Sequence, residues 1–176
     1  FATTWTVGPS GADYTTIQAA IDGATTGDSI QVAAGTYTEA LDLSGLNLNI
    51  TAPSGAASTV LRSPATKTSV RWLLSEDGQL NGFTVEPSKA RAFEIKGGAP
   101  TIQNCVVTLS GSTSSPVNGG GGHIDNGTPT FDTVTFSENT GRYGGTLYAE
   151  GGASVELIDV TIADSGGSYG GALFAK

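Results

Sequence analysis

The sequence has no methionine, one cysteine, one histidine and no long apolar run. Without a long apolar run, the chain cannot form a membrane-spanning helix. Because methionine is missing even at position 1, we expect a processed, secreted or cell-surface chain that has lost a secretory signal. The lone cysteine, Cys105, cannot form an internal disulfide, and its setting in NCVVTL predicts a buried thiol rather than a reactive one.

Charged residues are also scarce, at 14% of the chain, and acidic residues outnumber basic ones by 16 to 8. With a net charge of −8 and no basic patch, the chain is not expected to bind nucleic acid or anionic membranes. The 26 glycines follow no Gly-X-Y period, which excludes collagen. They lie between alternating apolar segments, as turn residues do, and the length predicts one domain over 1–176.

Segments about two dozen residues apart resemble one another. The clearest match is between 131–150 and 157–176, and weaker ones relate 100–111 to 129–140 and 80–85 to 102–107. The first match pairs Val134 with Val160, Phe136 with Ile162, Leu147 with Leu173 and Tyr148 with Phe174.

These repeats are rich in Val, Ile, Thr, Phe and Tyr with a period of two, which is typical of strands. A repeat of this length, with two or three short strands, has the size of one coil of a parallel β-helix, in which matched residues stack. We therefore predict an all-β, right-handed parallel β-helix of about six coils over 29–176. A Gly/Ser-rich insertion near 110–122 is expected to form a mobile loop.

Residues 1–28 differ from the repeats. An alternating segment at 1–7 predicts a strand, and the segment from Thr15 or Thr16 to Gly23 predicts a short helix. Its apolar residues Ile17, Ala20 and Ile21 share one face. We expect this face to cover the N-terminal end of the core, as atypical terminal units do in repeat proteins.

The stretch TIQAAIDGATTGDSIQVAAGTYTEAL, at 16–41, resembles the N-terminal entry of right-handed parallel β-helix proteins of the pectin-lyase-like superfamily, including pectin methylesterases. The resemblance implies a fold more than an activity, because this fold supports many functions. The segments FSEN at 136–139, GGTL at 144–147 and GGAL at 170–173 resemble the FxxN and GGA[ILV] repeats of chlamydial-type polymorphic outer membrane proteins. That resemblance implies a surface-exposed or secreted adhesive β-helix, although IADS at 162–165 and the Thr of GGTL depart from the pattern.

Glu138 and Asp164 are the best candidates for catalysis, because the repeat match places them on neighbouring coils. Two carboxyl groups about 5 Å apart suit retaining glycosidase chemistry. Both residues directly follow a predicted strand, where acidic side chains are usually solvated, so we favour a turn role. The motifs of pectate lyases, pectin methylesterases and galacturonases are absent, and we expect neither a metal nor a cofactor.

Two further pairs of residues could take part in catalysis or in ligand binding. His123 and Asp125 would share one face of a strand and could form a general base, although no nucleophile has an identifiable place beside them. Arg71 and Trp72 could form a sugar-stacking platform, but a core or edge role for the tryptophan is favoured.

Asn49 and Asn126 begin glycosylation sequons. They could instead point inward and form stacked amide ladders, and the sequence leaves both readings open.

The segment SYGGALFAK, at 168–176, has the form of an incomplete coil without a cap. Three interpretations remain open: a fragment of a longer β-helix, a subunit that joins the next subunit head to tail in a filament, or an open end that is tolerated or dimerises tail to tail. The residues expected in a head-to-tail contact are Phe1, Trp5 and Val7 of a donated strand together with Leu173 and Phe174.

The sequence therefore favours a non-catalytic extracellular structural or adhesive β-helix that associates with itself and contacts surface glycans. The alternative is a carbohydrate-active enzyme or sugar-binding module of the same fold. An enzyme needs clustered carboxylates with perturbed pKa values in a groove, whereas a structural rod needs polar ladders and specialised ends.

Overall fold

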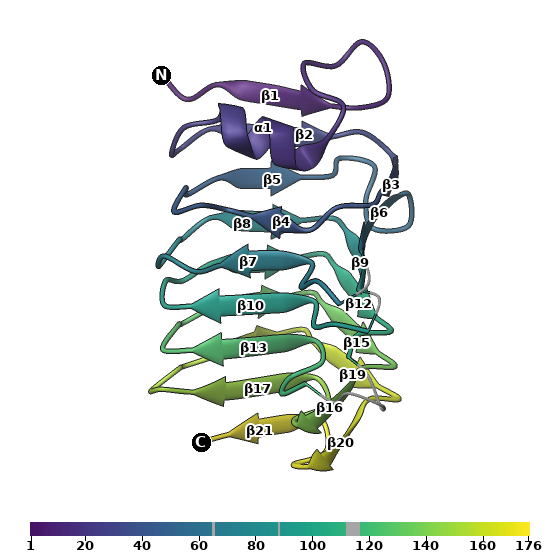
Figure 1. Ribbon diagram of the computed structural model, residues 1–176, viewed down its shortest axis with the longest axis vertical. Helices are drawn as coiled ribbons and strands as arrows, with labels where there is room; N and C mark the ends of the chain where they lie inside the picture. Colours follow the sequence, from purple (N-terminus) through teal and green to yellow (C-terminus); the bar gives the residue numbers. More distant parts are fainter. Residues whose placement is uncertain (65, 88, 112–116) are drawn as a thin grey trace.

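The chain forms a parallel β-helix of about six coils stacked along one axis, as predicted (Figure 1). The computed structural model describes residues 1–64, 66–87, 89–111 and 117–176. The loop expected near 110–122 falls partly on 112–116, which lie outside the described residues. In the described part of the chain, no helix is long and apolar enough to cross a membrane.

The described residues form three long sheets and one two-stranded side arm along the axis. Sheet A contains β1 (Thr4–Val7), β2 (Ser29–Val32), β5 (Asn49–Thr51), β8 (Gln79–Asn81), β11 (Thr101–Gln103), β14 (Thr130–Asp132) and β18 (Glu156–Ile158). Sheet B contains β3 (Gly35–Tyr37), β6 (Thr59–Ser63), β9 (Thr84–Pro87), β12 (Val106–Thr108), β15 (Thr135–Ser137) and β19 (Thr161–Ala163). Sheet C contains β4 (Leu41–Asp42), β7 (Val70–Trp72), β10 (Phe93–Lys96), β13 (Gly122–Asp125), β17 (Leu147–Glu150) and β21 (Leu173–Ala175), and the side arm pairs β16 (Thr140–Tyr143) with β20 (Gly166–Tyr169).

The register of the coils follows the repeats seen in the sequence. Phe136 pairs with Ile162, and the Thr161 N–H donates to the Val134 carbonyl at 3.0 Å, which sets Val160 beside Val134. Leu147 pairs with Leu173 in the same way. The stacking predicted from the sequence is therefore confirmed.

The core lies between the three sheets and consists of inward-facing strand residues together with corner residues such as Phe83, Cys105 and Val134. Four aromatic rings form a continuous path through it, with centroid separations of 6.0 Å from Trp72 to Phe93, 6.1 Å from Phe93 to Phe131 and 5.5 Å from Phe131 to Phe136. Trp72 is only 1% exposed, so it belongs to the core and cannot serve as a sugar-stacking platform. The thiol of Cys105 is buried as well, and this burial raises its pKa to about 11, which makes it a poor nucleophile.

A single left-handed residue turns the chain from sheet A into sheet B in successive coils. The residues at this corner are Gly82, Asn104, Thr133 and Asp159, with φ between 49° and 84°. Glycine fits at the first corner because a Cβ there would lie 2.7 Å from the carbonyl oxygen of Ala52. Threonine is a poor choice for this conformation because its side chain is β-branched.

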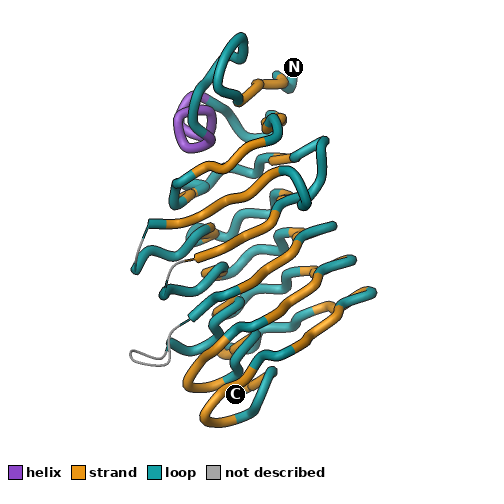
Figure 2. Tube along the Cα trace, turned by 90° about the vertical axis from the view of Figure 1, so that its right-hand side faces the viewer, coloured by secondary structure: helices purple, strands orange, loops and turns teal. Residues whose placement is uncertain are grey.

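The helix α1 (Ile17–Gly23) covers the N-terminal end of the core (Figure 2). Thr16 caps it, as its hydroxyl oxygen accepts from the Ala19 N–H at 3.3 Å, and the Glu39 carboxylate accepts from the first two N–H groups of the helix, those of Ile17 and Gln18. The predicted apolar face is buried, and Gln18 bonds both the N–H and the carbonyl of Asp42 in β4.

The outer edge of β1 is also covered by the chain itself. The Tyr14 N–H donates to the Thr6 carbonyl, the Gly8 N–H donates to the Tyr14 carbonyl, and the Thr6 N–H donates to the Asp13 carboxylate at 2.9 Å. These bonds satisfy backbone groups that would otherwise accept a further strand.

The last coil differs from the first. Strands β18, β19 and β21 are the outermost strands of their sheets among the described residues, and Leu157 and Leu173 are exposed. A hollow of about 440 Å³ opens between them, lined by apolar residues including Ala149, Ala153 and Val155. In the 176-residue chain, this end of the core therefore faces solvent.

We expect Thr133→Asn to stabilise the protein by about 1 kcal/mol, because asparagine tolerates the left-handed conformation better than threonine. Asn104 already occupies the same corner one coil earlier. Urea unfolding of the two proteins measures the difference. Thr135→Asn, in the adjoining strand and facing solvent, is the matched control and should give no gain; an equal gain there would contradict the explanation.

A second prediction concerns Asp28, whose carboxylate accepts hydrogen bonds from the N–H groups of Thr3 and Thr25 and from the Trp5 indole. These bonds, that of Thr3 foremost, lower the pKa of Asp28 to about 2. Because the folded-state pKa lies below the ordinary value of 3.8, the stabilisation is complete above that value and is lost as the pH falls toward 2.

We therefore expect the unfolding free energy of the wild type to fall more steeply between about pH 4 and pH 2 than that of Asp28→Asn. Chemical unfolding at several pH values measures both slopes. Asp159→Asn, at an exposed corner, is the control and should keep the wild-type slope. Equal slopes for wild type and Asp28→Asn would refute the assignment.

Candidate functional site

The outer face of sheet C carries a connected set of charged side chains that the register brings together. One outward residue per strand forms a column, with rungs about 4.8 Å apart. We call it the outer column, and its members are Asp42, Arg71, Glu94, His123, Tyr148 and Phe174.

The first half of the outer column is a chain of ion pairs. Arg71 lies 3.4 Å from the Asp42 carboxylate and 3.7 Å from that of Glu94. Glu94 also contacts Lys96 at 3.5 Å and Arg91 at 3.7 Å. Since most of these side chains are partly exposed, each pair adds little stability, but together they leave few charges without a counter-charge.

His123 is held from both sides. Its Nδ1 lies 2.9 Å from the guanidinium of Arg91, and its Nε2 lies 3.0 Å from the Glu150 carboxylate on the next coil. A guanidinium can only donate, so Nδ1 must accept and the proton of the neutral ring must sit on Nε2, where it is donated to Glu150. Both ring nitrogens are therefore occupied by the protein.

Glu150 is fixed in turn by the Tyr148 hydroxyl, which donates to it at 2.9 Å. This bond and the bond from His123 lower the pKa of Glu150, while the same carboxylate raises the pKa of Tyr148. Burial lowers the pKa of Arg91, and Glu94 offsets part of that effect. These shifts keep Glu150 ionised and Tyr148 protonated near neutral pH, which is the state that maintains the network.

The second half of the outer column is aromatic and is joined by rings from the side arm. Tyr148 stacks on Phe174 with centroids 5.6 Å apart, and Tyr143 stacks on Tyr169 at 5.0 Å. Tyr143 also contacts Phe174 at 5.1 Å. We call these four rings the outer aromatic cluster.

The structure places the sequence-based candidates as follows. Glu138 and Asp164 do lie on neighbouring coils, since the Glu138 N–H donates to the Ala163 carbonyl, and both are exposed corner residues with positive φ. Over the described ranges, no group of three or more His, Cys, Asp or Glu side chains could hold a metal ion. His123 and Asp125 share the outer face of β13, but the carboxylate that contacts His123 belongs to Glu150.

Asn49 and Asn126 are both exposed, so neither forms an inward amide ladder. A ladder of side-chain amides exists instead on the outer face of sheet A, where Gln79 donates to Gln103 at 3.1 Å and Gln103 donates to Asp132 at 2.7 Å.

Sequence reasoning missed Arg91, Glu150 and the outer aromatic cluster as parts of one surface. The pairing of Tyr143 with Tyr169 was visible in the repeats and could have located the side arm. The contact between His123 and Glu150 was missed because it is diagonal: the register pairs His123 with Tyr148 and Asp125 with Glu150.

Comparison of the chain with protein-family models, with curated proteins and with solved structures gives no match.

The arrangement around His123 predicts one tautomer. Because this is the only histidine in the chain, ¹⁵N NMR above the pH at which histidine titrates should show a single neutral ring protonated at Nε2. Arg91→Ala removes the donor at Nδ1 and should produce a mixture of both tautomers. A wild-type ring protonated mainly at Nδ1 would overturn the contact with Arg91.

Proposed function

We propose that this chain is a non-catalytic extracellular structural or adhesive β-helix that associates with itself through its last coil. The non-catalytic part of this proposal rests on one observation: the ionisable side chains of the outer column are bonded to other groups of the protein. The only imidazole of the chain uses both nitrogens within the protein, Glu150 also accepts from a hydroxyl, and Glu94 is paired with cations. A general acid or base needs a group that is free to exchange a proton with substrate.

The repeat motifs support a structural role as well. In FSEN, Phe136 fills the core and the Asn139 side chain donates to the Val107 carbonyl while accepting from the Ser110 N–H. In GGTL, a Cβ on Gly145 would lie 2.2 Å from the Gly166 carbonyl oxygen, so no side chain fits. The packing and hydrogen bonds of the coils therefore explain these motif residues, and no bound ligand is needed to explain them.

Extracellular location is part of the proposal. It is supported by the resemblance of 16–41 to entry segments of the pectin-lyase-like superfamily and by the resemblance of FSEN, GGTL and GGAL to polymorphic outer membrane protein repeats. The low charge content and the absence of a disulfide framework agree with a rod whose stability comes from strand stacking.

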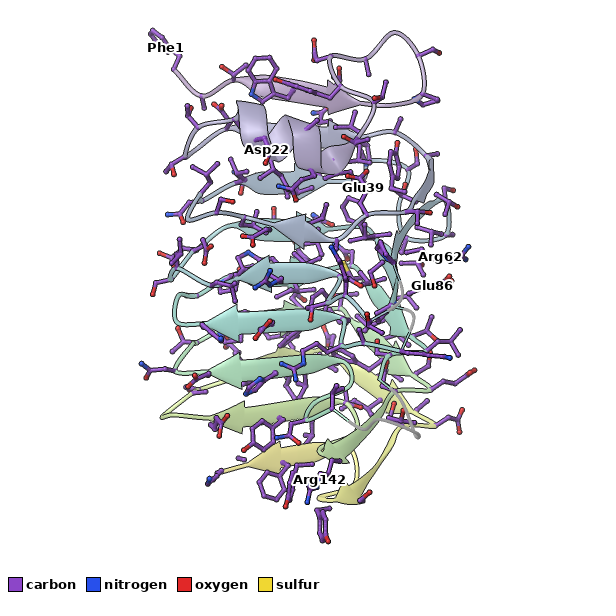
Figure 3. The ribbon with its side chains drawn as sticks, viewed as in Figure 1. Phe1, Asp22, Glu39, Arg62, Glu86 and Arg142 are labelled. Carbon is purple, nitrogen blue, oxygen red and sulfur yellow. The ribbon has the colours of Figure 1, made fainter. Side chains whose placement is uncertain are left out.

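Self-association is supported by the contrast between the two ends. Further strands cannot pair along β1 without displacing Tyr14 and Asp13, and Trp5 is committed to Asp28. Phe1 extends away from the body at that end (Figure 3). The opposite end presents Leu157, Leu173 and an apolar hollow. We therefore propose contact between two last coils, which forms a closed dimer, rather than a head-to-tail filament.

A sugar-binding module is the second candidate, and the observation that favours it is the outer aromatic cluster beside Glu150. An enzyme of the same fold is less well supported because Glu138 and Asp164 are exposed corner residues.

We expect the 176-residue chain to sediment as a dimer whose fraction rises with concentration, because association buries the exposed apolar residues of the last coil. Leu157→Glu with Leu173→Glu should give a folded monomer. Leu74→Glu, which changes a leucine that is 69% exposed far from the last coil, is the matched control and should remain dimeric.

Sedimentation velocity separates the outcomes, with circular dichroism to confirm folding. A wild-type monomer at all concentrations would refute self-association. Long fibres in electron micrographs would show that the copies join head to tail and would contradict the two-fold contact.

A further inference from the structure

Four aromatic rings gather on the outside of the β-helix, where the core does not require them. Tyr148 and Phe174 occupy successive rungs of the outer column, and Tyr143 and Tyr169 occupy successive rungs of the side arm. Tyr148 is nearly buried by its neighbours, whereas Tyr169 is 56% exposed. The earlier rungs of the same column carry charged or imidazole side chains, so the change to aromatic residues is local.

The rings present flat faces rather than a rounded apolar patch. The planes of Tyr143 and Tyr169 are 22° apart, and those of Tyr148 and Phe174 are 12° apart. Such stacked pairs hold each ring in one orientation, which lowers the entropy lost when a ligand stacks on them.

Polar groups that could orient a ligand surround the rings. The Arg142 guanidinium lies 5.4 Å from the centroid of Tyr143, and Figure 3 shows this side chain near the side arm. The Glu150 side chain is 31% exposed, and two donors hold it in place. Lys176 follows β21, and its N–H donates to the Ala149 carbonyl, which sets it beside Glu150. A few fixed polar groups around an aromatic surface are typical of small-ligand sites.

The charges around the cluster narrow the ligand class. Arg142 already occupies the region over the Tyr143 ring, so a cationic ligand would meet a like charge there. The protein carries a net charge of −8, which disfavours a polyanion such as a polyuronate. Next to Glu150, Lys176 supplies a positive charge. The cluster therefore suits an uncharged ligand with one apolar face and several hydroxyl groups.

We propose that the outer aromatic cluster binds an uncharged pyranose of a glycan chain. The apolar face of the sugar stacks on Tyr169 and Phe174, and its hydroxyls bond Glu150 and Arg142. This site goes beyond the proposed self-association, and it adjoins that surface because Phe174 also lines the apolar hollow of the last coil.

Titration calorimetry with cellohexaose and maltohexaose, which are uncharged, tests the proposal, and hexagalacturonate is the charged comparison. We expect at least one neutral hexasaccharide to bind more tightly than hexagalacturonate. Tyr169→Ala should weaken that binding about tenfold, the usual range for loss of one aromatic stack. Tyr169→Phe keeps the ring and should retain wild-type affinity. Because the ligand is bound and not cleaved, chromatography should recover it intact.

Leu157→Glu with Leu173→Glu should keep saccharide binding while losing the dimer, which separates failure of this site from failure of the assembly. No measurable binding of either neutral saccharide to the wild type would overturn the proposal. Equal affinity of wild type and folded Tyr169→Ala would overturn it too, as would tighter binding of hexagalacturonate.

Discussion

The hydrogen bonds between successive coils are the constraint on which the rest of the structure depends. Within each sheet, they place a strand residue beside its counterparts on the coils before and after it. Each side chain must therefore fit two neighbours in its column as well as its neighbours along its own strand. Phe136 above Ile162 and Leu147 above Leu173 show this for inward columns. Outward columns obey the same register without needing to be apolar, and the pairing of Asp42, Arg71 and Glu94 follows from it.

Stacking of this kind has no natural stopping point, because each coil leaves backbone donors and acceptors for the next. This chain stops the stacking at its N-terminal end with local acceptors and donors: the Asp13 carboxylate and the Tyr14 backbone on β1, and the Gln18 amide on β4. Asp28 then ties that first strand to the turn after α1. A few polar contacts, and not the core, therefore determine which end of the β-helix keeps backbone groups free to pair with a further strand.

The sequence allowed the fold, the capping helix and the stacking of Val134 with Val160 to be predicted, because inward columns repeat chemically similar residues. It also allowed the outward pair Tyr148 and Phe174 to be predicted, but not the charged half of the outer column, where neighbours are complementary rather than similar: Arg71 stands between two carboxylates. The orientation of Trp72 was uncertain for another reason. An alternating sequence pattern shows which residues share one face of a strand. Which of the two faces points into the core depends on the corner from which the strand starts.

The outer face of sheet C separates two kinds of surface chemistry on one scaffold. Around His123, the imidazole bonds Arg91 and Glu150, and Glu150 also accepts from the Tyr148 hydroxyl. Two rungs further on, Phe174 is half-buried, and Tyr169 on the side arm is 56% exposed. The two halves of the outer column are physically connected, because Glu150 bonds both His123 and Tyr148, and Tyr148 in turn stacks on Phe174.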